Sequence, residues 1–298
     1  MMLLFALALF VALPCRAQAQ APGSPDTVAV HSGSLTLHAL LWRPRGPGPF
    51  PAVLFNHGSY STGAPLTSDE LAVWGPVFAR RGYVFLFLCR QGIGLSSGEG
   101  TADGDLMSQA FATEGQDGRN RVQLELLQGA ELNQAASALA YLRALPQVDP
   151  GRVAVIGHSF GGSLTLLLAQ QDTSIRAAVV FSGAALSWNR SPQRRTRLLD
   201  AVRRMNVPVF LIHAANDYST ESGKALAREM QARGKPHRLR IYPPNGHTPR
   251  EGHAFVFQGI EVWERDVFDF LDRRLNRERV GLSSPLRHLK LSIRNPKI

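Results

Sequence analysis

The sequence predicts an α/β fold with a mostly parallel central sheet of about eight strands and helices on both faces. Two observations lead to this prediction. Short, almost entirely apolar segments alternate along the chain with longer segments of helical periodicity. Strands that are apolar throughout are buried on both faces, which is typical of parallel sheets covered by helices. The chain has 298 residues, 44% of them hydrophobic, which is enough for one large core.

The first 19 residues are interpreted as a targeting segment. Residues 1–13 are almost all apolar, but they are too few to span a bilayer as a helix. Pro14 interrupts this run, and Ala17-Gln18-Ala19 has the small-x-small pattern of a cleavage site. We therefore expect a signal peptide at residues 1–19, a secreted or periplasmic protein, and no stable membrane insertion after cleavage. An uncleaved anchor is the alternative.

The first half of the chain begins with two strands around the turn sequence Ser32-Gly33-Ser34. A segment rich in glycine and polar residues predicts a surface loop, and leucines at helical spacing predict one long helix that Pro146 ends. The expected elements are, in order, two strands within 27–42, a strand at 52–55, a helix over 71–81, a strand at 83–88, a loop over 92–118 and a helix over 122–145.

The second half continues the alternation of strands and helices. The expected strands are 153–156, 177–181, 209–213 and 238–242, and the expected helices are 162–170, 222–233 and 259–275. Residues 182–205 form a polar, arginine-rich insertion that is a candidate cap. Residues 276–298 carry six basic side chains against Glu278 alone, and we interpret them as a basic, mobile tail behind a catalytic domain of residues 20–275.

The formal net charge of +10 comes almost entirely from arginine. The arginines are scattered, with a local cluster at Arg194, Arg195 and Arg197 that we interpret as solvated surface. Because no basic strip with interleaved aromatic residues is present, we expect no nucleic-acid partner. Cys89 lies in an apolar run and is interpreted as a core residue rather than a nucleophile.

The segment Gly157-His158-Ser159-Phe160-Gly161 joins an apolar strand directly to a helix. In this context a Gly-x-Ser-x-Gly sequence forms a tight turn that exposes the serine hydroxyl above the end of the sheet. The two glycines leave room for neighbouring backbone, and the start of the helix directs N–H groups toward a developing oxyanion. Ser159 is therefore the expected nucleophile.

A serine nucleophile needs a base and an acid that orients the base, and in this kind of turn the chain order is Ser, acid, His. Asp217 follows the strand at 209–213 and is the expected acid. Glu221 is the second choice, and Asp200 is a poor candidate because it precedes that strand. Two histidines, His247 and His253, lie between the last strand and the last helix, and one of them is expected to be the base.

The loop after the strand at 52–55 is expected to supply a second oxyanion donor. Gly58 permits a sharp turn there, so we assign the donors to the backbone N–H groups of Ser59 and Phe160. Tyr60 is expected to form one wall of the pocket. His57 is interpreted as a hydrogen-bonding residue of the turn rather than a catalyst.

These segments resemble the α/β-hydrolase superfamily, in particular its dienelactone hydrolase and prolyl-oligopeptidase-like branch of serine hydrolases. The matching stretches are PFPAVLFNHGS, CRQGIGLSSG, LPQVDPGRVAVIGHSFGG, HAANDYST and EGHAFVF before WERDVFDFL, which together span about residues 49–275. In such relatives a Gly-His-x-Phe segment before the terminal helix carries the catalytic histidine, and this favours His253 over His247. Dienelactone hydrolases proper use a cysteine nucleophile, whereas this sequence has Ser159, which favours an ester over dienelactone.

The resemblance and the residues together imply an exported serine hydrolase that cleaves a small-molecule carboxylic ester through an acyl-enzyme. They imply no metal and no organic cofactor. Two alternatives stay open at this point. One is a serine peptidase or amidase of the prolyl-oligopeptidase-like type, and the other is a hydrolase-fold binding protein without turnover.

Overall fold

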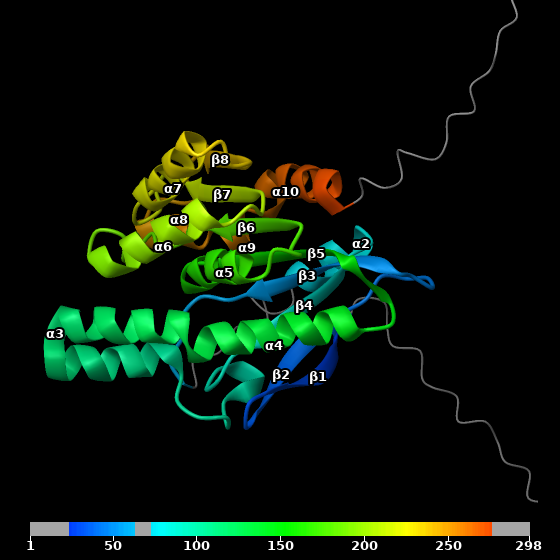
Figure 1. Cartoon of the computed structure of the whole chain (residues 1–298), viewed down its shortest axis with the longest axis horizontal. Coiled ribbons are helices and arrows are strands. Elements are labelled where there is room, and N and C mark those ends of the chain that lie inside the picture. The colour runs from blue at the N-terminus through cyan, green and yellow to red at the C-terminus, as the bar shows by residue number, and fades with distance from the viewer. Residues whose placement is uncertain (1–23, 63–72, 276–298) are drawn as a thin grey trace, which may run out of the picture.

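The computed structural model describes residues 24–62 and 73–275, and its eight strands form a single mixed sheet (Figure 1). The strand order is β1-β2-β4-β3-β5-β6-β7-β8. The pairs β1–β2 and β2–β4 are antiparallel, and the others are parallel. The predicted sheet is thereby confirmed. The strands are β1 (Asp26–Ser32), β2 (Leu35–Trp42), β3 (Phe50–Asn56), β4 (Val84–Cys89), β5 (Val148–His158), β6 (Ala177–Phe181), β7 (Val209–Ala214) and β8 (His237–Tyr242).

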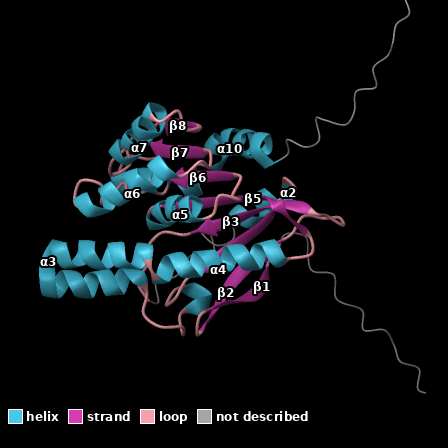
Figure 2. Ribbon diagram, viewed as in Figure 1, coloured by secondary structure: helices cyan, strands magenta, loops and turns pink. Residues whose placement is uncertain are grey.

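Helices cover both faces of the sheet (Figure 2). One face packs against α4, α5, α6 and α7, and the other packs against α2 and α10. This division explains why the central strands are apolar on both sides, as the sequence pattern predicted. The bounds are α2 (Trp74–Arg80), α3 (Asp103–Gln128), α4 (Ala130–Ala144), α5 (Phe160–Gln171), α6 (Pro192–Arg204), α7 (Glu221–Ala232), α8 (Pro249–His253), α9 (Phe255–Gln258), α10 (Ile260–Leu275) and the short 3₁₀ helix η1 (Gly94–Ser96).

The core under α2 and α10 is built from aromatic side chains. Trp74 of α2 and Trp263 of α10 are fully buried, and their ring centroids lie 4.8 Å apart. Phe181 of β6 meets both rings edge-on. Buried aromatic groups of this size dominate core energetics, and they fix α10 against the sheet. The residues between β8 and α10 are thereby held over the carboxyl ends of the strands.

The structure differs from the sequence prediction in the segment before β5. Residues 103–118 were predicted to be part of a loop, but they belong to α3, and the predicted helix over 122–145 is divided between α3 and α4 at Gly129. Gly115, with φ of 65°, reverses the chain inside α3, so that its two halves form a helical hairpin that projects from the body (Figure 1). The hairpin is polar because much of it is exposed. A polar composition is typical of surface loops, so the sequence predicted a loop here.

The segments interpreted as a signal peptide (residues 1–19) and a basic tail (residues 276–298) lie outside the described residues. Within residues 24–62 and 73–275, no helix has the length and apolar character needed to cross a membrane. Cys89 is fully buried in β4, and burial raises the pKa of its thiol to about 11, which confirms a core position for this residue.

Candidate active site

Ser159 occupies a strained turn between β5 and α5. Its backbone has φ of 55° and ψ of −113°, a combination that side-chain-bearing residues rarely adopt. The neighbouring glycines are required by close packing. A Cβ on Gly161 would lie 2.0 Å from the carbonyl oxygen of Asn56, and one on Gly157 would lie 2.2 Å from the carbonyl oxygen of Gly161. The turn therefore fixes the position of Ser159, which lines a cavity.

The backbone around Ser159 determines which N–H groups could serve an oxyanion. The Ser159 N–H donates to Phe181 O at 2.9 Å, and the first hydrogen bond along α5 runs from Ser163 N–H to Ser159 O at 3.3 Å. Phe160 comes before the first residue that donates inside the helix, so its N–H has no partner within α5 and points out of the helix start. The loop carrying Ser59 is adjacent, because a Cβ on Gly58 would lie 3.5 Å from Ser159 Cβ. Ser59 and Phe160 both line the cavity.

A buried ion cluster holds the loop after β3. The guanidinium of Arg90 donates to the carbonyl oxygens of His57 at 2.8 Å and Gly58 at 2.9 Å. It also pairs with the carboxylates of Asp103 and Glu131, and all three charged side chains are almost fully buried. Carbonyl oxygens fixed in this way orient the peptide groups of the turn, so Arg90 is a positioning residue for the loop that carries Ser59.

His57 serves the same turn, in agreement with its interpretation from sequence. Its Nδ1 lies 2.7 Å from Gly58 O and its Nε2 accepts a hydrogen bond from the Arg90 N–H at 3.2 Å. The ring is fully buried. Burial, followed by the charge of Arg90, holds the pKa of His57 well below its ordinary value. The imidazole is therefore neutral and both of its nitrogens are used in structural hydrogen bonds.

Asp217 follows β7 and bridges two histidines. Its Oδ1 lies 2.8 Å from His253 Nδ1, and its Oδ2 lies 2.8 Å from His213 Nδ1. The Tyr218 N–H donates a further hydrogen bond to Oδ1 at 2.8 Å. Burial by itself would raise the pKa of Asp217, but the hydrogen bonds from His213 and His253 lower it well below its ordinary value. Asp217 is therefore an ionised acceptor that orients the His253 ring.

The two candidate histidines have different surroundings. His253 ends α8, lines the cavity and contacts Asp217, whereas His247 is exposed and its N–H donates to Glu251 Oε2 at 2.9 Å. A capping box between Thr248 and Glu251 begins α8 and fixes this short turn. The segment that sequence analysis treated as a loop thus contains α8 and α9. Glu221, the second choice for the acid, accepts a hydrogen bond from Lys224 on the surface of α7.

Asp200, considered and set aside as an acid, bonds Arg203 on α6. His158, beside the candidate nucleophile, donates a hydrogen bond from Nε2 to the His253 carbonyl oxygen at 3.0 Å, and the two ring centroids are 4.7 Å apart. Within the described residues no hydrogen bond joins Ser159 Oγ to His253. Catalytic hydrogen bonds are often long in the free enzyme and tighten when substrate binds.

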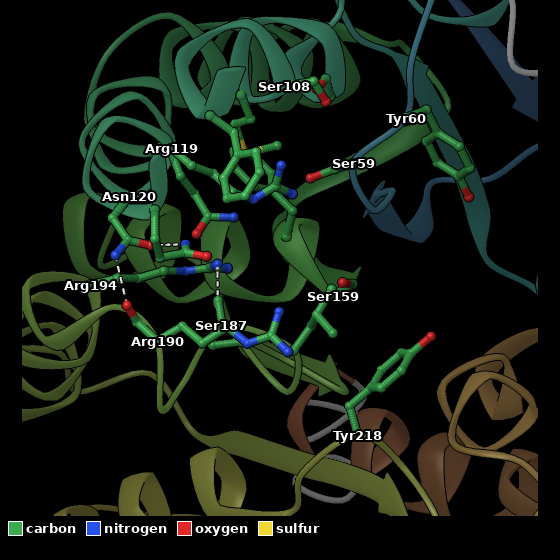
Figure 3. Close-up of a pocket in the computed structure, with 18 of the residues that line it drawn as sticks. Ser59, Tyr60, Ser108, Arg119, Asn120, Ser159, Ser187, Arg190, Arg194 and Tyr218 are labelled. Carbon is green, nitrogen blue, oxygen red and sulfur yellow. Dashed lines mark hydrogen bonds between the residues drawn. The ribbon is translucent and has the colours of Figure 1, made fainter. Parts of the chain in front are cut away.

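Ser159 and His253 share a cavity of about 640 Å³ (Figure 3). Its walls come from the loop after β3, the α3 hairpin, the residues between β6 and the first turn of α6, and Tyr218. Tyr60 lines it, as expected from sequence. The hairpin is joined to the segment after β6 by a hydrogen bond from Asn120 Nδ2 to Arg190 O at 2.7 Å. Two separate insertions therefore cover the site, of which only residues 182–205 were anticipated.

Sequence analysis missed the polar wall of this cavity. The lining residues not anticipated include Met107, Phe111, Gln116, Arg119, Asn120 and Gln123 of the hairpin and Tyr218 and Arg250 elsewhere. Arg190 and Arg194 lie in the anticipated insertion, but no place in the cavity wall was predicted for them. Buried Asn120 and Gln123 lie on one helical face, a signal that the loop assignment obscured. The interpretation of Arg194 as solvated surface is wrong, because the side chain is buried against the start of α5.

In residues 24–62 and 73–275, no group of three or more His, Cys, Asp or Glu side chains is arranged to hold a metal ion. The candidate site residues follow the carboxyl ends of β3, β5 and β7, where parallel sheets commonly bind ligands. A strained serine and an imidazole held by a buried carboxylate, which line one cavity, are groups that acyl transfer uses.

The sequence profile of the dienelactone hydrolase family matches residues 37–258. The chain is 27% identical over 158 residues to the quorum-quenching protein AidA of Acinetobacter baumannii, covering 53% of this chain and 43% of AidA. It is 29% identical over 127 residues to carboxymethylenebutenolidase 1 of Cupriavidus pinatubonensis, covering 43% of this chain and 47% of that protein. The chain thus spans less than half the length of these two curated relatives.

Solved structures show the same fold. An acylaminoacyl peptidase from Pyrococcus horikoshii superposes with a TM-score of 0.60 and 16% identity over 84% of this chain and 42% of the peptidase. Est1E from Butyrivibrio proteoclasticus superposes with a TM-score of 0.57 and 18% identity over 84% of this chain and 99% of Est1E. At these identities the similarity establishes the α/β-hydrolase fold, as the sequence predicted.

Proposed function

The chain belongs to the dienelactone hydrolase family, and we propose that it hydrolyses a carboxylic ester through a Ser159–His253–Asp217 triad. The observation that carries the proposal is the geometry around one cavity. Ser159 is held in its strained turn with φ of 55°, and His253, which lines the same cavity, is bonded to Asp217 at 2.8 Å. A strained turn of this kind is maintained only where the surrounding structure enforces it, and such sites are commonly catalytic.

In the proposed reaction, His253 Nε2 accepts the hydroxyl proton while Ser159 Oγ bonds to the ester carbonyl carbon. The carbonyl oxygen becomes an oxyanion that accepts hydrogen bonds from the N–H groups of Ser59 and Phe160. The bond to the alcohol oxygen then breaks, and the alcohol leaves with the proton from His253. Water next attacks the acyl carbon, gives a proton to His253 and releases the acid, which restores Ser159.

Two observations bear on the choice of a small-molecule carboxylic ester. Ser159 stands where dienelactone hydrolases proper carry a cysteine, and a serine alkoxide is well matched to an unactivated ester carbonyl. The α3 hairpin, together with the residues after β6, leaves a cavity of about 640 Å³, a volume in the usual range for small-molecule sites.

A fluorophosphonate probe tests the nucleophile, because it reacts with serines activated by a base. We expect a single adduct on wild-type protein and none on Ser159→Ala. Turnover of 4-nitrophenyl acetate should exceed that of an N-acetylated amino-acid 4-nitroanilide. Preferred cleavage of the anilide would favour a peptidase or amidase, and labelling without turnover of either substrate would favour a binding protein.

We also propose that the protein is exported to the periplasm or the medium. The support is the apolar run of residues 1–13 followed by Ala17-Gln18-Ala19. Expression with the native leader in a Gram-negative host should yield extracytoplasmic protein whose N-terminus is Gln20. A cytoplasmic protein that still begins at Met1 would contradict this proposal.

A further inference from the structure

The loop that carries Ser59 is hydrogen-bonded to the start of the α3 hairpin. The Tyr60 N–H donates to Asp103 Oδ1 at 3.1 Å, and the Gly104 N–H donates to Tyr60 O at 3.0 Å. Asp103 and Gly104 are the first two residues of α3. The hairpin therefore begins against the same backbone segment that carries the candidate oxyanion donor.

The peptide group between Gly58 and Ser59 is held from its carbonyl side. Gly58 O accepts hydrogen bonds from Arg90 Nη2 at 2.9 Å and from His57 Nδ1 at 2.7 Å. His57 Nδ1 is the donor because Nε2 of the same ring accepts from the Arg90 N–H. This peptide is trans, so its N–H points away from its carbonyl oxygen, and the two bonds direct the Ser59 N–H to the opposite side. Ser59 lines the same cavity as Ser159 (Figure 3).

Asp103 links the peptide groups on the two sides of Ser59. Its Oδ2 accepts a hydrogen bond from Arg90 Nη2 at 3.3 Å, while its Oδ1 accepts from the Tyr60 N–H. Arg90 Nη2 is the same nitrogen that donates to Gly58 O. Asp103 is fully buried, and hydrogen bonds that involve ionised groups are stronger than those between neutral groups. One carboxylate thus holds the peptide group after Ser59 directly and the one before it through Arg90.

Gly104 allows the hairpin to approach the loop closely. A Cβ on Gly104 would lie 2.5 Å from Tyr60 O and 3.0 Å from Ser61 N. The φ of Gly104 is not positive, so space rather than backbone conformation requires a glycine here. Because interiors are close-packed, a larger residue must displace the backbone directly after Ser59.

We propose that Asp103 and Gly104 are positioning residues that fix the direction of the Ser59 N–H, so that the α3 hairpin belongs to the oxyanion site. This inference rests on the proposed ester hydrolysis, in which Ser59 is a donor. An oxyanion donor must lie about 2.7–3.1 Å from the oxygen on which charge develops, and loss of one donor lowers kcat about 10²- to 10³-fold. Displacement of the loop should therefore slow acylation while Ser159 and His253 stay in place.

The test compares 4-nitrophenyl acetate with its thiono analogue, in which sulfur replaces the carbonyl oxygen. Sulfur is a weak hydrogen-bond acceptor, so a well-formed oxyanion site should favour the oxygen ester. Both rates are measured as kcat/KM with the enzyme-free rate subtracted, and the oxygen-to-sulfur ratio is the readout. A smaller fraction of folded protein lowers both rates equally and leaves this ratio unchanged. The ratio therefore reports on the oxyanion site and not on stability.

Gly104→Ala and Asp103→Ala should each lower the oxygen-to-sulfur ratio about 10- to 100-fold, since a displaced donor is partly or wholly lost. Asp103→Asn keeps an oxygen for the Tyr60 N–H but loses the negative charge that faces Arg90. Its ratio should lie between those of wild-type protein and Asp103→Ala. Gly98→Ala is the matched control, because a Cβ on Gly98 would meet nothing within 4 Å, and it should keep the wild-type ratio.

A wild-type ratio in folded Gly104→Ala or folded Asp103→Ala protein would overturn the proposal. If one of these variants fails to fold, as judged by circular dichroism, the other decides the question. If both fail, Asp103→Asn decides it by the same criterion, because this variant keeps the side-chain volume and leaves Arg90 paired with Glu131.

The same measurements separate this proposal from the proposed function. Ser159-dependent hydrolysis of the oxygen ester, with a ratio that the hairpin variants leave unchanged, would remove the positioning role and keep the esterase. Absence of Ser159-dependent hydrolysis in wild-type protein would remove the proposed function itself.

Discussion

His213→Ala removes one of the two imidazoles that hold Asp217. His213 is 1% exposed at the end of β7, and its Nδ1 lies 2.8 Å from Asp217 Oδ2. The substitution leaves a buried carboxylate oxygen without that partner, whereas the bonds of Oδ1 to His253 and to the Tyr218 N–H remain. We therefore expect a positioning defect in the triad, smaller than the loss of a triad member.

The magnitude follows from the hydrogen bond that is lost. A hydrogen bond to a charged group contributes about 1.5–3 kcal/mol, so the free energy of unfolding should fall by about 2 kcal/mol. For a domain of this size that corresponds to a decrease in Tm of about 4–8 °C. If misplacement of Asp217 raises the activation free energy by about 1.4 kcal/mol, kcat for 4-nitrophenyl acetate falls about tenfold.

The assay measures kcat, KM and Tm for three variants. His213→Asn carries a donor near the position of Nδ1 and should recover part of kcat, which a loss of packing alone would not explain. His247→Ala, at an exposed histidine in the same region, is the control and should keep the wild-type kcat and Tm. An unchanged kcat in His213→Ala, or equal losses in the Ala and Asn variants, would refute the reasoning.

Three further predictions concern the same machinery. His253→Ala should lower kcat by about 10⁴-fold or more in steady-state ester hydrolysis, whereas His247→Ala should stay close to the wild-type kcat; the reverse ranking would move the base to His247. Gly161→Ala should give protein that is insoluble or has a much lower Tm, because its Cβ would lie 2.0 Å from Asn56 O; a wild-type melting curve would show that the turn relaxes. Asp217 has a lowered pKa in the folded chain, so its ionisation stabilises the fold above about pH 4 and this contribution is lost as pH falls toward the folded pKa. Asp217→Asn should consequently lower Tm more at pH 7 than at pH 3, and equal losses at the two pH values would contradict this linkage.

The sheet was predictable from sequence because each buried strand is a separate apolar run. The strand 153–156 and the Gly-x-Ser-x-Gly segment after it are local features, so their relation required no knowledge of distant contacts. Asp217 and His253 could be proposed from chain order, and the structure brings their side chains together at 2.8 Å. The resemblance to a family, rather than spacing alone, favoured His253 over His247.

The cavity wall could not be predicted in the same way. The α3 hairpin is polar and contains Gly104, Gly115 and Gly118, which in sequence resemble a loop. Gly118 permits close contact within the hairpin, since its Cβ would lie 2.4 Å from Glu114 Cβ. Arg194 looked like one member of an exposed cluster, because burial of a cation depends on tertiary packing and not on its neighbours in sequence.

The central claim is that Ser159 forms an acyl-enzyme, and acid-quenched mass spectrometry tests it most directly. During turnover of 4-nitrophenyl acetate, the peptide containing Ser159 should gain one acetyl group in wild-type protein. The adduct should be absent from Ser159→Ala, whose circular dichroism spectrum should be unchanged and whose turnover should be lost. An adduct on another residue, or Ser159→Ala protein that hydrolyses the ester at the wild-type rate, would contradict the account.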